Sequence, residues 1–83
     1  MTRYYFDLRD GDELALDQEG LELPAIEAAE REAVRSLAEL ARGEVLISRR
    51  DDRSFDRLGV EVRDDSGPLF KVRFFFESDR TRH

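Results

Sequence analysis

The stretch from Pro24 to Gly43 constrains the fold of this chain most, because it is the only segment with clear helical periodicity. Its apolar residues recur at steps of three and four, with Val34 at the margin of the stripe: Ile26, Ala29, Ala33, Leu37, Leu40 and Ala41. Pro24 suits the first helical turn, and Gly43 suits a left-handed stop. Residues 45–47 are apolar and leave two alternatives open, one further helical turn or an irregular flap over the core. A helix with one apolar stripe needs an apolar surface to cover it.

Segments of alternating apolar and polar residues lie on both sides of this helix and predict two hairpins. The first runs from Arg3 to Asp17 and turns at Asp10-Gly11, and the second runs from Leu58 to Phe76 and turns at 64–67. Leu21–Leu23 is expected to be a short extended piece before the helix. The residues expected to point inward are Tyr4, Phe6, Leu8, Leu14, Leu16, Leu58, Val60, Val62, Leu69, Phe70, Val72, Phe74 and Phe76.

The order ββαββ predicts an α+β fold, in which a four-stranded, mostly antiparallel sheet packs against one helix. We expect a single domain over residues 1–83, with an exposed loop at 49–57 and a frayed tail at 78–83. One helix is narrower than four strands, so part of the apolar sheet surface should remain for a partner.

A chain of 83 residues has a thin stability margin, which small proteins often widen with disulfides, metals or a partner subunit. This sequence has no cysteine and one histidine, His83 at the end of the chain. Disulfides and histidine-based metal sites are therefore excluded, no cofactor is expected, and a homodimer is the favoured state. An unidentified protein partner is the other interaction that we expect.

The net charge of −6 argues against a general binder of nucleic acid or of anionic membranes, because both partners need a positive field. Residues 1–43 carry eleven acids against five bases, whereas residues 44–83 carry nine of each. The sequence shows neither an apolar run long enough to span a membrane nor a signal-peptide pattern, so we expect a cytoplasmic protein. Thirteen of the fourteen basic residues are Arg, which suggests a GC-rich bacterial genome.

Three motifs are distributed along the chain between residues 3 and 67. They are R-Y-Y-F-D-L-R-D-G at residues 3–11, D-Q-E-G-L-E-L-P at residues 17–24 before an Ala/Glu/Arg helix, and V-E-V-R-D-D-S-G at residues 60–67. This combination resembles a family of small bacterial proteins classed as a domain of unknown function, whose opening pattern is R-Y-[FY]-F-x-L-x-D-G. Ala25 departs from the acidic residue expected after the proline. The resemblance implies a fold and assigns no catalytic residue.

An enzyme is not expected, because nucleophilic catalysis by a Ser-His or Cys-His pair would depend on His83 at the chain end. One acidic group could be considered as a metal site, but it lacks the spacing of a calcium loop, and turn and surface solvation explain it better: Asp7, Asp10, Asp12, Glu13 and Asp17.

Alternation places a basic and aromatic set of side chains on the outward face of the sheet. The candidate binding residues on this face are Tyr5, Arg63, Lys71, Arg73 and Phe75. Aromatic rings flanked by Arg on an open sheet can stack single-stranded nucleic acid, and this is the competing hypothesis. The favoured interpretation is that these charges form cross-strand pairs and that the protein is a non-enzymatic interaction module, self-associating through its sheet.

Overall fold

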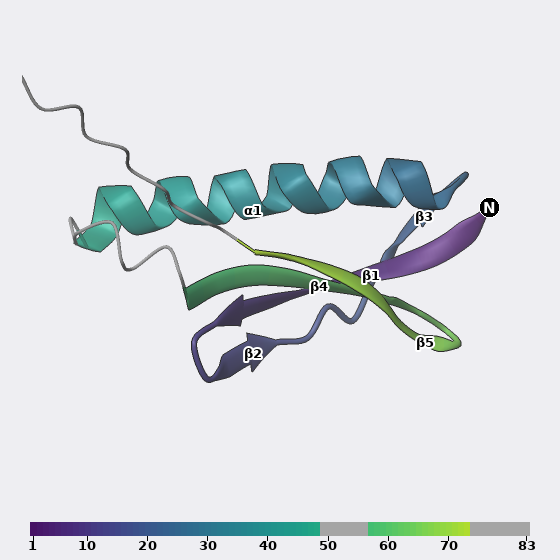
Figure 1. Ribbon diagram of the computed structural model, residues 1–83, viewed down its shortest axis with the longest axis horizontal. Coiled ribbons are helices and arrows are strands. Elements are labelled where there is room, and N and C mark those ends of the chain that lie inside the picture. Colours follow the sequence, from purple (N-terminus) through teal and green to yellow (C-terminus); the bar gives the residue numbers. More distant parts are fainter. Residues whose placement is uncertain (49–56, 74–83) are drawn as a thin grey trace, which may run out of the picture.

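A computed structural model describes residues 1–48 and 57–73 of the chain, which form five strands in one sheet and one helix (Figure 1). The elements are β1 (Thr2–Asp10), β2 (Glu13–Ala15), β3 (Leu21–Leu23), α1 (Ile26–Ser48), β4 (Leu58–Asp64) and β5 (Gly67–Arg73). The predicted α+β fold is confirmed, but the sheet has five strands instead of the expected four, because Leu21–Leu23 pairs with β1 as a further strand. The expected loop at 49–57 lies outside the described residues except for Arg57, and so do Phe74, Phe75, Phe76 and the expected tail at 78–83.

The strands follow the order β2-β1-β4-β5, and β3 also pairs with β1. Each pair of neighbouring strands is antiparallel. β2 pairs with Leu8–Asp10 and β3 pairs with Thr2–Tyr4, so the two short strands take different halves of β1. The connection at 16–20 therefore leaves the sheet between them.

The core lies between α1 and the sheet, and α1 runs along one face of it (Figure 1). The buried face of the helix consists mainly of small side chains, which lets the helix backbone come close to the strands. The residues of this core are Tyr4, Phe6, Ala29, Ala33, Leu37, Ala41, Leu58, Val60 and Val62. β4 supplies three of them and lies in the middle of the packed layer, and Phe6 faces the helix as expected.

The helix differs from the sequence prediction at both ends. It begins at Ile26, so Pro24 precedes it instead of occupying its first turn. It also continues through Gly43 to Ser48, and Gly43 does not have a positive φ. The predicted stop was wrong because no helix breaker follows Gly43, and the helical alternative for residues 45–47 is correct. Among the described residues, no helix is long and apolar enough to cross a membrane.

Leu14 and Leu16 do not belong to the core, in contrast to the prediction. The turn at 11–12 places Leu14 directly opposite Arg9, and opposed residues share a face, so Leu14 lies on the side away from the helix. Leu14 is 39% exposed and Leu16 is 59% exposed. From β3, Leu23 packs against the core, whereas Leu21, opposite the buried Tyr4, is 42% exposed.

Leu69 is also outside the core. The β4–β5 register shifts between Val62 and Arg63, where Phe70 and Pro68 are the successive partners, and Leu69 is the extra residue. Its side chain is 39% exposed. The inward orientation predicted for Phe70 and Val72 is therefore correct, and the one predicted for Leu69 is wrong.

Candidate functional site

The sheet face opposite the helix, here called the outer face, carries the basic residues that the alternation pattern predicts. The register places Tyr5 opposite Arg63, Glu61 opposite Lys71, and Gly59 opposite Arg73. Four of the five candidate residues thus lie on this face, and the fifth, Phe75, lies outside the described residues. The structure divides the four into two groups with different surroundings.

The first group is an ion-pair cluster, here called the Asp7 cluster, that consists of Tyr5, Asp7, Asp17 and Arg63. Arg63 donates from Nε to Asp7 Oδ2 at 2.9 Å, and from its NH2 group to the Asp17 carbonyl oxygen at 3.0 Å. The Asp17 amide donates to Asp7 Oδ1 at 2.8 Å. Asp7 is 4% exposed although it lies on the outer face. Arg63 and the connection at 16–20 thus cover Asp7.

Asp17 holds this connection in place with its carboxylate. One oxygen accepts from the Phe6 amide at 3.1 Å, and the other accepts from the amides of Glu19 and Gly20 at 3.1 and 3.2 Å. Partial burial raises the pKa of Asp17, but these three backbone hydrogen bonds and the nearby Arg63 charge lower it, and the net pKa is below its ordinary value of 3.8. Asp17 therefore satisfies backbone groups that would otherwise lack partners where the sheet is interrupted.

The side chains of Tyr5 and Arg63 are in contact with each other. The Arg63 guanidinium carbon lies 4.5 Å from the centroid of the Tyr5 ring, which is a cation–π contact. The hydrogen bond to Asp7 raises the pKa of Arg63 above its ordinary value, so the guanidinium stays charged. Gly20 lies against the same ring, because a Cβ added there would be 2.9 Å from Tyr5 Cε1. These two candidate residues thus stabilise the fold of the outer face.

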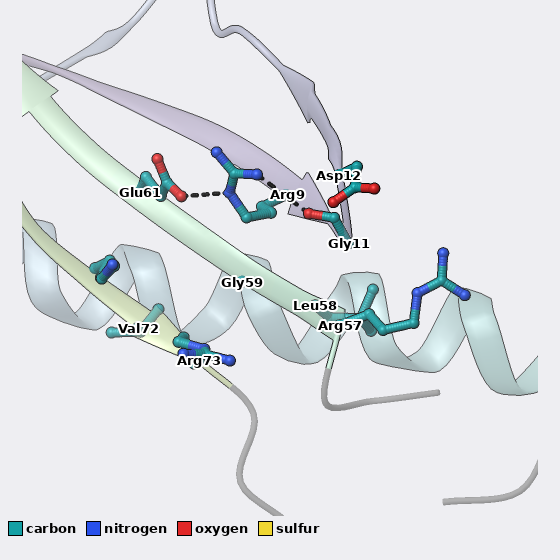
Figure 2. A pocket seen from close by; sticks show the side chains of 10 residues that line it. Arg9, Gly11, Asp12, Arg57, Leu58, Gly59, Glu61, Val72 and Arg73 are labelled. Carbon is teal, nitrogen blue, oxygen red and sulfur yellow. Dashed lines mark hydrogen bonds and ion pairs between the residues drawn. The ribbon is translucent and has the colours of Figure 1, made fainter. Parts of the chain in front are cut away.

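Lys71 and Arg73 lie elsewhere on the outer face, beside a hollow of about 470 Å³ above Gly59 (Figure 2). We call this feature the Gly59 hollow. Its lining includes four bases and two acids: Arg9, Arg57, Lys71, Arg73, Asp12 and Glu61. Gly59 is flanked in the register by Arg9 on β1 and by Arg73 on β5. A glycine thus stands where a side chain would otherwise separate two arginines.

Arg9 has a fixed orientation at the wall of the hollow. Its Nε group donates to Glu61 Oε2, and its NH1 group donates to the Gly11 carbonyl oxygen at 3.1 Å (Figure 2). Arg57 forms a longer ion pair with Asp10, at 3.5 Å from Nε to Oδ1. Within residues 1–48 and 57–73, neither Lys71 nor Arg73 has an ion-pair partner.

Arg57, Gly59 and Arg9 were not among the candidate residues predicted from the sequence. One signal was present: an isolated glycine inside a strand pattern marks a bulge or a close approach. Only the strand order shows that Gly59 lies between Arg9 and Arg73, because their residue numbers are far apart. The position of Arg57 depends on its carbonyl oxygen, which accepts from the Gly11 amide at 2.8 Å.

The far edge of β5 is the second feature of interest. β5 ends the strand order, and among the described residues no strand pairs with its other side. On the helix-facing side, Val60 and Val62 of β4 are at most 1% exposed, whereas Phe70 and Val72 of β5 are only partly buried. The cover provided by α1 therefore ends at β5.

The acidic residues of the first hairpin do not gather around a common point. Asp7 and Asp17 bind Arg63 and backbone amides, and Asp10 pairs with Arg57. In the part of the chain that the structure describes, no group of three or more carboxylate or histidine side chains could hold a metal ion. Surface solvation was the wrong explanation for Asp7, which is buried.

A family model described as a domain of unknown function, DUF6894, matches residues 3–75. No curated protein and no solved structure matches the chain. The matched range contains the Asp7 cluster, the Gly59 hollow and the whole of β5, and the family description assigns none of them an activity.

Proposed function

The chain belongs to the DUF6894 family of unknown function, and from its open sheet edge we propose that it is a non-enzymatic interaction module that self-associates through β5. The observation that carries this proposal is the combination of an unpaired β5 edge, among the described residues, with incompletely covered apolar side chains beside it. A strand edge with free backbone groups is a template for pairing with another chain.

The details of β5 restrict where a second copy would pair. Pro68 has no N–H group, and Leu69 interrupts the register, so the first part of β5 is unsuited to a continuous ladder. Phe70–Arg73 is regular. Antiparallel pairing of this segment with its copy would extend the sheet and bury more of Phe70 and Val72. A symmetric dimer uses the same surface twice and therefore needs no other partner.

Size and composition support self-association. An 83-residue chain without cysteine has no disulfide to widen its stability margin, and a dimer interface would add buried apolar surface. A bacterial and cytoplasmic setting is part of this proposal, and the predominance of Arg over Lys supports the bacterial origin.

The first test is the mass of the full chain in solution across micromolar concentrations, by light scattering. The monomer has a mass of 9.7 kDa, so a dimer would have 2 × 9.7 = 19.4 kDa. We expect the mass to rise toward the dimer value with concentration. A constant monomer mass over this range would refute self-association.

The second test locates the interface by cysteine cross-linking, which the cysteine-free sequence makes simple. Single variants Leu69→Cys, Lys71→Cys and Arg73→Cys place a thiol along the exposed side of β5. At least one of them should form a disulfide-linked dimer under mild oxidation, because residues near a two-fold axis come close together. Arg31→Cys, on the exposed face of α1, is the matched control. Equal cross-linking of the control would place the contact outside β5.

Single-stranded nucleic-acid binding is the competing function. Lys71 and Arg73 are neighbouring bases on the open outer face, which favours it, whereas the Tyr5 ring is already in contact with Arg63. Base stacking by Tyr5 would require that contact to open.

A further inference from the structure

The Gly59 hollow has the chemistry of a small anion site. Where three residues lie directly opposite one another on three neighbouring strands, the side chain of the central residue normally separates the side chains of the outer two. Here the central residue is Gly59, and its neighbours in the row are Arg9 and Arg73 (Figure 2). Strands β1 and β5 are two strand spacings apart, or about 9 to 10 Å. Gly59 is itself buried, and a Cβ added there would lie 3.6 Å from Arg73 Cγ, so the two arginine side chains flank a glycine that the Arg73 stem partly covers.

The hollow also has hydrogen-bond donors that are not used within the described residues. Arg9 uses its Nε group and one NH1 proton for Glu61 and Gly11. A guanidinium has five N–H donors, so Arg9 keeps about three. Its contacts with Glu61 and Gly11 fix its orientation, which reduces the entropy cost of binding a ligand. Lys71 and Arg73 add further donors from the opposite wall.

The charge around the hollow differs in sign from the charge of the whole protein. Four bases and two acids line it, although the chain carries a net charge of −6. Arg9 is paired with Glu61 and Arg57 with Asp10, so among the described residues the excess positive charge at the hollow comes from Lys71 and Arg73. A long polyanion would meet the negative remainder of the surface, whereas a small anion would meet only the local positive field. A tetrahedral oxyanion can also accept from several donors at once, and arginine forks suit its geometry.

We propose that the Gly59 hollow is a binding site for one phosphate group, either inorganic phosphate or a small phosphate monoester, held by Arg9, Lys71 and Arg73. The site does not depend on self-association, because these side chains lie on the outer face and not on the backbone edge of β5.

The test is a titration of the full ¹⁵N-labelled chain at low salt with inorganic phosphate, adenosine monophosphate or adenosine, followed by NMR. Inorganic phosphate and the monophosphate should shift the Gly59 amide and the Arg73 Nε–H signals, and adenosine should not. Arg73→Gln and Lys71→Gln should each weaken phosphate binding about five- to tenfold, because each removes a charged donor. Arg31→Gln, which removes the same charge from the helix face, should leave the affinity unchanged.

The proposal would be overturned if phosphate shifted no signal near Gly59, or if Arg31→Gln weakened binding as much as Arg73→Gln. Equal shifts with adenosine would also overturn it, since they would show that the phosphate group is not what is recognised. A single-stranded oligonucleotide that bound where inorganic phosphate and the monophosphate did not would overturn it in favour of nucleic-acid binding.

Discussion

Arg63 and Asp7 lie diagonally across β1 and β4, and they bond to each other although each has a different residue directly opposite. The register places Asp7 opposite Glu61, and Arg63 opposite Tyr5. The diagonal contact brings the guanidinium over the Tyr5 ring and lets it reach the Asp17 carbonyl oxygen as well. Arg63, on β4, therefore binds both β1 and the segment at 16–20 that joins β2 to β3.

Asp7→Asn should destabilise the fold by about 1 to 3 kcal/mol, because it removes the charged acceptor for Arg63 and alters the bond from the Asp17 amide. The measurement is the free energy of unfolding from urea denaturation. Asp12→Asn is the matched control, since Asp12 is exposed at a turn and should change stability by less than about 0.5 kcal/mol. Equal losses from the two variants would contradict the structural importance of the Asp7 cluster.

Asp17 should contribute to acid sensitivity. Its pKa is lower in the folded state than its ordinary value of 3.8, so the unfolded chain binds a proton more readily. The stabilisation is fully present above the unfolded pKa of about 4, and it is lost as the pH falls through the lower folded value.

The measurement for Asp17 compares the urea unfolding of the wild type and Asp17→Asn at about pH 6 and at about pH 2. The variant should lose about 1 to 2 kcal/mol at the higher pH, because an amide has one acceptor oxygen where the carboxylate uses two. This difference should shrink at the lower pH. A difference that grew on acidification would contradict the assigned pKa shift.

Gly20 and Gly43 should respond in opposite ways to alanine. Gly20 has a φ of +73°, and an added Cβ would lie 2.8 Å from Arg3 Cγ. We expect Gly20→Ala to destabilise the protein by more than about 1 kcal/mol. Gly43 is inside α1, and among the described residues an added Cβ would meet no atom within 4 Å apart from its chain neighbours and the adjacent helix backbone, so Gly43→Ala should stabilise the protein by about 0.5 to 1 kcal/mol. Thermal unfolding measures both, and a destabilised Gly43→Ala variant would contradict the helical extension.

The small side chains of α1 set its distance from the sheet. Ala33 has no exposed surface, so Ala33→Leu should overpack the interface and cost about 1 to 3 kcal/mol. Ala38 is exposed on the same helix, and Ala38→Leu adds the same atoms without that contact. Circular dichroism during heating should show a lower melting temperature for the first variant alone. Similar melting temperatures for both variants would mean that Ala33 is not close-packed.

The sequence was sufficient for the fold class because its two periodicities differ clearly. The three-and-four spacing of Ala29, Ala33 and Leu37 defines a helix, and the alternation of Val60 and Val62 with polar residues defines a strand. Boundaries were less predictable. A single glycine costs only about 1 kcal/mol in a helix, and no proline follows Gly43 within α1, so the helix can continue past it.

The candidate site was predictable only in part, because it depends on which strands become neighbours. Alternation correctly assigned Lys71 and Arg73 to the outer face. Alternation could not show that Arg63 bonds to Asp7 and is therefore not available to a ligand. It also could not show that Gly59 lies between Arg9 and Arg73 in the sheet. Those relationships follow from the pairing of β4 with both β1 and β5. The inward assignment of Leu14 failed for the same reason, since the turn register decides its face.

Nucleic-acid binding, the competing function, makes a prediction that separates it from the phosphate site. A single-stranded binder that uses several cations should lose affinity steeply as salt rises, because counterions are released from each neutralised phosphate. Fluorescence anisotropy with a labelled oligonucleotide measures this slope, and Arg73→Ala should reduce it by about one contact. Arg35→Ala, on the exposed helix surface, is the control. An affinity for the oligonucleotide that did not change with salt, or an equal effect of both variants, would exclude this function. Lys71 and Arg73 would then be assigned to the binding of a smaller anion.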